Sequence, residues 1–397
     1  MRAMKDSGIE WIGKIPEDWS VCRLDQTGRY INGYAFKPEE WSEFGLPIIR
    51  IQDLSGSNSN PNYYQGEIDQ KYLVREGDLL VSWAATLDTY RWHGSDAWLN
   101  QHIFKVECSK SLNKSYLRWL LKVAIHYLDS GNKHGIVMQH LTWRMFAHCA
   151  VPLPPYDQQF VIGSFLDSQC EVFEQSENCL SKQISTLEHY RASVIHEAVV
   201  RGLDPTVSTK PSGVDWIGSI PQHVRLMRLK DVLRINNGRE IENEEGNIPV
   251  YGSGGQFKWT DRPLCKKPAL LMGRKGTIDK PLLVDEPFWT VDTMFFGTPI
   301  TDCELRFIYY CALCFDFNYY QTGSTVPSMT QTDLGGILLP FPPIVEQVAI
   351  ADYLDARTAA IDAVLETKRK QLDILKRRRQ SLIYEYVTGK RRVTEEA

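Results

Sequence analysis

Two long stretches of the chain share one spacing of inward-facing positions, in which steps of four and three residues alternate. Such a spacing indicates a helix with a narrow stripe that packs against a second helix. The later stripe is Ile361, Leu365, Lys368, Leu372, Leu375, Arg379, Leu382 and Tyr386. The earlier stripe, 188 residues upstream and in the same register, is Phe173, Glu177, Leu180, Ile184, Leu187, Arg191, Val194 and Ala198.

Each stretch begins with prolines, at 152–155 and 340–343, and then carries a glutamine, Gln159 or Gln347. Proline is tolerated at the start of a helix and not further along it, so both proline runs predict helix starts. About 45 residues would form a rod of roughly 65 Å. Each stripe is narrow and contains charged positions, so we expect each helix to pair with the other. The alternative is an ordinary amphipathic helix on a globular core, but the length and the duplicated register favour the pair.

A shorter sequence repeat precedes each of the two regions that lie outside the long helical stretches. Residues 7–16 read Ser-Gly-Ile-Glu-Trp-Ile-Gly-Lys-Ile-Pro, and residues 212–221 read Ser-Gly-Val-Asp-Trp-Ile-Gly-Ser-Ile-Pro. The chain is therefore a tandem duplication, for which we expect a pseudo-two-fold arrangement with antiparallel helices. The expected divisions are a first domain at 1–151, a helix at 152–203, a second domain at 204–340 and a helix at 341–397. Since residues 212–221 follow the first helix, residues 7–16 should meet the end of the second near Val387.

The two domains show the same order of elements with few identical residues. In the first we predict strands at 47–51, 77–83 and 99–106 and a helix at 115–128. In the second we predict strands at 248–251, 269–272 and 289–296 and a helix at 302–317. Residues 203–210 are the expected linker. The predicted fold class is α+β: two globular α/β domains separated by a long antiparallel two-helix coiled coil.

Composition and charge add limits to this picture. The chain has 397 residues and ordinary apolar and charged fractions, and its sequence shows neither a membrane-length apolar run nor a signal peptide, so we expect a cytoplasmic protein without a membrane partner. The net charge is −4, so any contact with nucleic acid must come from local basic patches. Residues 152–211 carry 4 basic and 8 acidic side chains, whereas residues 341–397 carry 11 and 9. Opposite signs are expected if the helices pair.

A search for catalytic motifs predicts no enzyme. Asn60-Pro61-Asn62-Tyr63 lacks the second proline of an adenine methyltransferase motif, and no phosphate-binding GxxxxGK[ST] loop occurs. The glycine-rich run 251–255 is better explained as a turn. Cys311 and Cys314 form a CxxC without a second pair or a nearby histidine, so no metal site is expected. We expect this chain to hold no catalytic residues, metal or cofactor.

Polar side chains that suit nucleic-acid binding gather in the predicted loops. Arginine, lysine, asparagine and glutamine can read base edges in the major groove, and serine, threonine and glycine amides suit phosphates. Any one such cluster is also typical of a solvated polar loop. The candidate DNA-binding residues are Arg50, Gln52, Arg91, Gln101, His102, Lys133, His134, Tyr251, Arg274, Lys275, Thr277, Ser324, Thr325 and Ser328.

On these motifs the whole chain resembles the specificity subunits of type I restriction-modification systems. The similarity is carried by Trp-Ile-Gly-x-Ile-Pro at 11–16 and 216–221, by Pro-x-Pro-Pro…Gln at 152–159 and 340–347, and by the duplicated helices. Residues 99–104 and 273–277 also look like pieces of this family. The resemblance implies two target-recognition domains, each reading one half of a split, asymmetric site in double-stranded DNA, and a coiled coil that sets the gap.

The resemblance also implies the partners. Two modification subunits would carry S-adenosylmethionine and methylate adenine, and restriction (translocase/nuclease) subunits would join where the system has them. The alternative is a coiled-coil scaffold whose two domains hold proteins. A basic, aromatic surface on both domains would favour DNA, and an apolar groove would favour protein.

Overall fold

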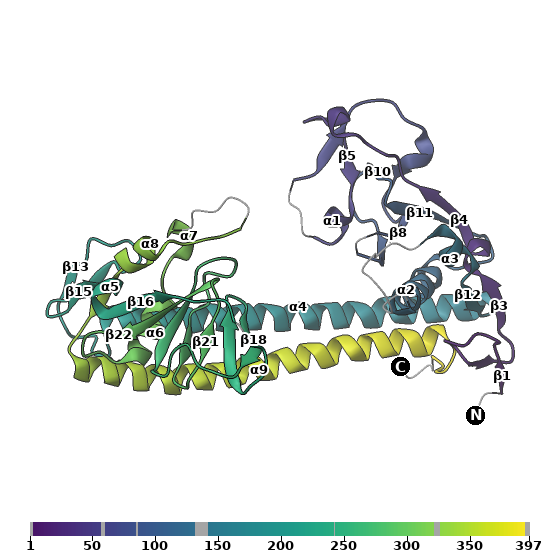
Figure 1. Cartoon of the computed structure of the whole chain (residues 1–397). Coiled ribbons are helices and arrows are strands. Elements are labelled where there is room, and N and C mark those ends of the chain that lie inside the picture. The colour runs from purple at the N-terminus through teal and green to yellow at the C-terminus, as the bar shows by residue number, and fades with distance from the viewer. Residues whose placement is uncertain are drawn as a thin grey trace. The chain divides into compact units, whose positions relative to one another are not determined.

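The computed structural model describes residues 3–56, 60–84, 86–131, 142–241, 243–320 and 326–393. It divides into two compact units (Figure 1). The first unit comprises Met1–Cys179 together with Leu372–Ala397, and the second comprises Leu180–Gln371. Each unit therefore holds one sheet-rich domain and a part of both long helices. No helix in the described ranges has the length and apolarity needed to span a membrane.

The domain of the first unit contains two four-stranded sheets, with strand orders β4-β11-β8-β9 and β6-β5-β10-β7. Its strands are β1 (Met4–Asp6), β2 (Lys14–Pro16), β3 (Ser20–Arg23), β4 (Gly28–Asn32), β5 (Leu46–Ile49), β6 (Asn62–Tyr64), β7 (Leu73–Val74), β8 (Leu79–Ser82), β9 (Asp88–Arg91), β10 (Ala97–Leu99), β11 (Ile103–Cys108) and β12 (Ala150–Leu153). Its helices are α1 (Ile51–Leu54), α2 (Lys114–Gly131) and α3 (Trp143–His148).

The domain of the second unit repeats this plan, with strand orders β16-β22-β19-β20 and β18-β17-β21. Its strands are β13 (Thr209–Pro211), β14 (Ser219–Pro221), β15 (Arg225–Arg228), β16 (Leu233–Asn237), β17 (Ile248–Gly252), β18 (Gly255–Thr260), β19 (Ala269–Gly273), β20 (Leu282–Val284), β21 (Trp289–Thr290), β22 (Met294–Pro299) and β23 (Leu338–Phe341). Its helices are α5 (Leu229–Val232), α6 (Leu305–Ala312), α7 (Phe317–Tyr320) and α8 (Gln331–Gly336).

Several predicted elements are wrong in extent. The strands predicted at 99–106 and 289–296 are each interrupted by a turn, because β10 and β21 belong to one sheet and β11 and β22 to the other. Buried apolar residues on both sides of each turn make the sequence look continuous. The helix predicted at 302–317 is shorter, since Glu304 caps the start of α6 by accepting a hydrogen bond from the Arg306 amide, and α6 ends at Ala312. The strand β13 also begins within the linker expected at 203–210.

The long helices are α4 (Tyr156–Arg201) and α9 (Ile344–Val387), and each begins directly after a proline pair. They run antiparallel within each unit. In the first, the rings of Phe165 and Tyr386 lie 4.6 Å apart, and Arg379 pairs with Glu177 at 3.4 Å. In the second, Arg191 pairs with Asp362 at 2.8 Å and Arg369 with Glu188 at 2.6 Å.

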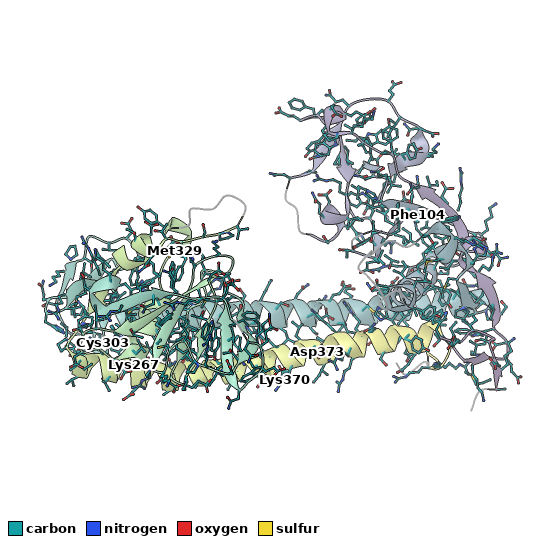
Figure 2. All side chains as sticks on the ribbon, viewed as in Figure 1. Phe104, Lys267, Cys303, Met329, Lys370 and Asp373 are labelled. Carbon is teal, nitrogen blue, oxygen red and sulfur yellow. The ribbon has the colours of Figure 1, made fainter. Side chains whose placement is uncertain are left out.

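The predicted stripe positions are the less exposed ones along these helices. Between 359 and 381 on α9, every position off the stripe is exposed, and every position on it is partly or fully buried. Lys370 and Asp373, which lie off the stripe, project from α9 (Figure 2) and pair with residues four positions away on the same helix. A stripe this narrow leaves most of each helix in contact with solvent.

The short repeat forms a hairpin in both units, and each hairpin binds the C-terminal end of a long helix. In the first unit, the Tyr384 hydroxyl donates to the carbonyl oxygen of Trp11 at 2.8 Å. In the second, Nε2 of His196 lies 2.6 Å from the carbonyl oxygen of Trp216. Tyr384 and His196 occupy equivalent positions of the helical repeat, 188 residues apart. The expectation that residues 7–16 meet the end of the second long helix is confirmed.

A buried glutamine joins each domain to the start of its long helix. The Gln159 amide donates to the carbonyl oxygen of Pro154 at 2.9 Å and accepts from the Asn113 amide, just before α2, at 2.8 Å. Gln347 repeats both bonds, donating to Pro342 at 2.9 Å and accepting from Glu304, just before α6, at 3.0 Å. These side chains are 2% and 0% exposed. The repeated glutamine therefore fixes the domain helix on the long helix.

A repeated aspartate makes the next contact along each long helix. Asp167 accepts a hydrogen bond from Nε1 of Trp119 on α2 at 2.8 Å. Asp355 accepts from the hydroxyl of Tyr310 on α6 at 2.7 Å and pairs with Arg306 at 2.6 Å. Burial, with the Asp355 carboxylate nearby, raises the pKa of Tyr310 to about 12, so its hydroxyl remains a donor at neutral pH.

Replacing Gln347 by alanine should loosen α6 and leave α2 unchanged. The substitution leaves the Glu304 amide and the Pro342 carbonyl without their partner, at about 1–3 kcal/mol for each buried group. Hydrogen exchange should therefore accelerate at 305–312 and not at 114–131. Gln159→Ala should show the reverse, and Gln371→Ala, at an exposed position of α9, should change neither region. Equal exchange in Gln347→Ala and Gln371→Ala would contradict the role given to Gln347.

Candidate nucleic-acid interface

One turn occupies the same place in both domains, where the chain passes from one sheet to the other. In the first unit, the Ile103 amide donates to the carbonyl oxygen of Asn100 at 3.1 Å. In the second, the Met294 amide donates to that of Val291 at 3.0 Å. The turn follows β10 or β21, which lies parallel to β5 or β17. Parallel neighbours end at the same sheet edge, so the residues after β5 and β17 lie beside the turn.

A glycine closes this turn against the first large strand of each domain. The Gly33 amide donates to Ile103 at 3.1 Å, and the Gly238 amide donates to Met294 at 3.0 Å. A Cβ atom on Gly33 would lie 2.0 Å from the Asn100 carbonyl oxygen, and one on Gly238 would lie 1.9 Å from that of Val291. No larger residue fits without moving the backbone, so both turns are held rigidly.

In the first unit, the turn presents Gln101 and His102 next to an aromatic residue. The Gln101 backbone amide donates to Tyr34 at 2.9 Å, which leaves the side chain for other contacts. The exposed His102 lies 5.4 Å from the Trp83 ring, measured between centroids. Trp83 in turn donates from Nε1 to the side-chain oxygen of Asn32 at 3.1 Å.

Arg50 and Gln52 follow β5 and therefore reach the same edge. Arg50 occupies the N-cap position of α1 and forms an ion pair with Asp53 at 3.2 Å. It also donates to the carbonyl oxygen of Asn60 at 3.1 Å. Its guanidinium thus braces the neighbouring loop, whereas Gln52 is exposed on the first turn of α1.

In the second unit, the structure brings together Tyr251, Arg274, Lys275, Thr277 and Ser328. The Arg274 amide donates to Thr293 in the turn at 2.8 Å, and the Arg274 carbonyl accepts from the Met329 amide at 2.9 Å. Its guanidinium donates to the Asp292 carbonyl at 3.3 Å and lies over the Phe295 ring. Lys275 is exposed, and its backbone forms an isolated antiparallel β-bridge with Ser328.

Some candidate residues lie elsewhere. Arg91 pairs with Leu79 at the far end of β8 from Trp83, and there it lines a small cavity with Lys114, Arg118 and Asp167. Lys133, His134, Ser324 and Thr325 lie outside the described residues.

Sequence reasoning missed Trp83 and Thr293 as parts of this surface. The Trp83 amide donates to the His102 carbonyl oxygen at 3.3 Å, and the Arg274 amide makes the equivalent bond to the Thr293 carbonyl oxygen. Trp83 and Arg274 are therefore structural counterparts. Each residue follows a buried strand, β8 or β19, and these two strands occupy the same position in their sheets. The strands predicted at 77–83 and 269–272 end at positions that are not counterparts, so the sequence carries no signal of this correspondence.

Each surface offers groups of the kinds that contact nucleic acids. The first combines an indole, an imidazole and side-chain amides, and the second combines a guanidinium, an ammonium and hydroxyls. Such groups hydrogen-bond to base edges and phosphates, and aromatic rings pack on bases. Within the described residues, no group of three or more histidine, cysteine, aspartate or glutamate side chains could hold a metal ion.

These features define a duplicated scaffold with two non-identical candidate binding surfaces. The model of the type I restriction modification DNA specificity domain matches the chain twice, over residues 16–185 and 221–373. The chain belongs to this type I restriction-modification DNA specificity family.

Two relatives and one solved structure agree with this assignment. The type I restriction enzyme MjaVIII specificity subunit of Methanocaldococcus jannaschii is 24% identical over 416 residues, covering 96% of this chain and 94% of that protein. The EcoBI specificity subunit of Escherichia coli is 27% identical over 197 residues, covering 49% of this chain and 41% of that protein. A chain from a structure described in terms of complex assembly of the type I R-M system has the same fold, with a TM-score of 0.67 and 16% identity over 94% of this chain and 99% of that one.

Alanine at Gly238 should disturb the second turn. The added methyl group meets backbone atoms that cannot rotate away, and overpacking of this kind costs about 1–3 kcal/mol. We expect a lower thermal midpoint and faster hydrogen exchange at 290–294. The control is Gly336→Ala in α8, where an added Cβ meets nothing within 4 Å. Matching exchange in the two variants would show that the close approach is not required.

Proposed function

We propose that this chain is the sequence-specific DNA-binding subunit of a type I restriction-modification complex. Each target-recognition domain reads one half of a split, asymmetric site. The observation that carries the proposal is the pair of equivalent turns bearing different side chains. Trp83 and His102 in one domain stand where Arg274 and Thr293 stand in the other. One framework with two chemistries suits two different half-sites.

The chemistry of the complex belongs to partner subunits in this proposal. Two modification subunits bind S-adenosylmethionine and methylate adenine, and restriction subunits join where the system has them. Support comes from the names of the relatives and from the absence of methyltransferase and ATPase motifs in the sequence. The length of the paired helices, 46 and 44 residues, would set the gap between the half-sites.

Exposed apolar residues near the start of both long helices support one docking surface for a modification subunit on each helix. Phe160 on α4 and Val348 on α9 are 58% and 36% exposed and stand 188 residues apart in the repeat. Tyr156 and Val161 next to the first, and Val345 next to the second, are also exposed. Paired apolar patches of this kind are typical of protein interfaces.

Methylation mapping tests the function as a whole. The gene is expressed with and without a modification subunit, and methylated adenines are located in the host DNA. We expect one split motif that appears only when both are present. The purified chain alone, incubated with labelled S-adenosylmethionine and DNA, should incorporate no methyl groups. Incorporation by the chain alone would refute the assignment of catalysis to partners.

Arg274→Ala should weaken recognition of one half-site. If the guanidinium reads a base, the loss is about 1–3 kcal/mol and is specific to that half-site. If it only contacts phosphate, affinity falls alike for all sequences. Binding is measured on duplexes carrying the mapped motif and on duplexes altered in either half. The control is Lys267→Ala, which removes an exposed cation of the same domain (Figure 2). Unchanged affinity for every duplex would remove Arg274 from the interface.

Charged substitutions at Phe160 and Val348 should each displace one modification subunit. An aspartate buried in an apolar interface without a partner is strongly unfavourable. Native mass spectrometry should therefore show one bound subunit for Phe160→Asp or Val348→Asp and none for the double variant. Val172→Asp is the control, because Val172 is exposed but its counterpart is Ala360. Two bound subunits in the double variant would place docking elsewhere.

A further inference from the structure

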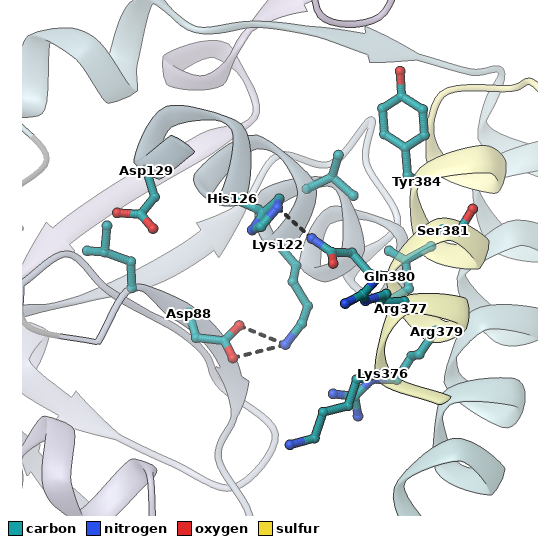
Figure 3. Close-up of a pocket in the computed structure, with 13 residues that line it drawn as sticks. Asp88, Lys122, His126, Asp129, Lys376, Arg377, Arg379, Gln380, Ser381 and Tyr384 are labelled. Atoms are coloured by element: carbon teal, nitrogen blue, oxygen red, sulfur yellow. Dashed lines mark hydrogen bonds and ion pairs between the residues drawn. The ribbon is translucent and has the colours of Figure 1, made fainter. Parts of the chain in front are cut away.

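The first unit contains an open cavity of about 710 Å³ between α2 and α9 (Figure 3). Lys122 and His126 of α2 form one wall, and Lys376 and Arg377 of α9 form the other. Leu87 and Asp88, from the loop joining β8 to β9 and the start of β9, also line it. We call this cavity the basic groove.

The cations of the basic groove are only partly neutralised. Lys122 pairs with Asp88 at 2.8 Å, and Arg377 pairs with Asp373 at 2.8 Å while its side chain stays 78% exposed. Lys376 and the adjacent Arg378 are exposed and have no ion-pair partner within the part of the chain that the structure describes. The groove is lined by four cationic side chains, Lys122, Lys376, Arg377 and Arg379, and by two carboxylates, Asp88 and Asp129, so it keeps an excess of positive charge.

The fold does not require this charge. In the helical repeat, Lys376, Arg377 and Arg378 correspond to Glu188, His189 and Tyr190. The next position is arginine in both copies, and each of these arginines forms an ion pair with a residue of the opposite long helix. The ion pair between the long helices that both copies share is therefore made by the arginine on the stripe.

The α2 wall of the groove is also particular to the first unit. The glutamine contacts align Asn113 with Glu304, so that Lys122 and His126 correspond to Leu313 and Phe317 in the second unit. Leu313 lies beyond the end of α6 and Phe317 begins the separate helix α7, so the wall formed by α2 has no counterpart on α6. The basic residues of the first unit are therefore explained by a ligand better than by stability.

The groove adjoins the candidate interface of its own unit. Ser82 pairs with Asp88 in the β8–β9 hairpin, so Trp83 and Leu87 lie at the same end of that hairpin. Trp83 contacts His102 in the turn at 100–102, and Leu87 lines the groove. The turn and the groove are therefore linked by one end of the β8–β9 hairpin.

We infer that the basic groove binds backbone phosphates of duplex DNA next to the half-site read by the first domain. This rests on the proposed function and adds to it a sequence-independent contact made by a spacer helix. Lys376 and Arg377 line the groove and supply its charge, Arg378 is the next exposed cation on α9, and Lys122 can exchange Asp88 for a phosphate. Continuity with the turn favours DNA over an acidic protein segment.

Salt dependence of binding tests this inference. The full-length variant K376Q/R377Q/R378Q keeps good helix formers at exposed positions and should fold as the wild type does. Its affinity for a mixed-sequence duplex is measured by fluorescence anisotropy across a salt series. Each lost phosphate contact should reduce the slope of log K against log salt by about 0.9, so we expect a reduction of roughly two to three. The control R225Q/R228Q/K230Q removes the same charge from exposed positions of β15 and α5 and should change the slope little.

The outcomes separate the inference from the proposed function. A groove variant with the slope of the control overturns the inference, while the proposed function stands if the wild type still binds DNA. A wild type that binds no DNA overturns both. If the groove variant binds DNA normally but loses a modification subunit, the groove is a protein-binding site and the inference is wrong. The groove variant should also lose the same affinity for motif and non-motif duplexes, since phosphates carry no sequence information.

Discussion

The buried glutamine at the start of each long helix is the contact on which the rest of the arrangement depends. A polar amide that is 0% or 2% exposed is stable only if its donor and acceptor are both bonded. Gln159 and Gln347 meet that condition by linking the proline run to the backbone just before the domain helix. Because one side chain bonds both segments, the direction of each domain helix follows from the direction of its long helix.

With the domain helix fixed, the remaining contacts follow in order along each long helix. Asp167 and Asp355 hold the next turn of α2 or α6, and the short hairpins close on the far helix ends through Tyr384 and His196. The bonding roles persist although the residue types differ between copies. The sheet-rich domains are thereby held by a small polar framework, and their outward side chains are left to differ.

The scaffold could be predicted because its sequence pattern occurs twice in the chain. Shared register identified the long helices, their stripe and the docking of residues 7–16, since a chance pattern would not recur 188 residues away. The turns at 100–102 and 291–293 could not be predicted, because the residues on both sides of each turn are buried and apolar and read as one strand. The structural equivalence of Trp83 and Arg274 in the two domains could not be predicted for a further reason. It is fixed by backbone hydrogen bonds, which constrain no side chain.

The discontinuity of the first unit has a consequence for biosynthesis. Residues 180–371 form one uninterrupted unit, whereas the first unit needs residues 372–397 in addition to the first 179. Domains generally fold as units as the ribosome releases them, usually from the N-terminus onward. Here the N-terminal domain lacks the part of its core that α9 contributes until residues 372–387 emerge, so the domain synthesised second is the first that can complete its core. A ribosome that stops early would release a chain whose defect lies at its beginning.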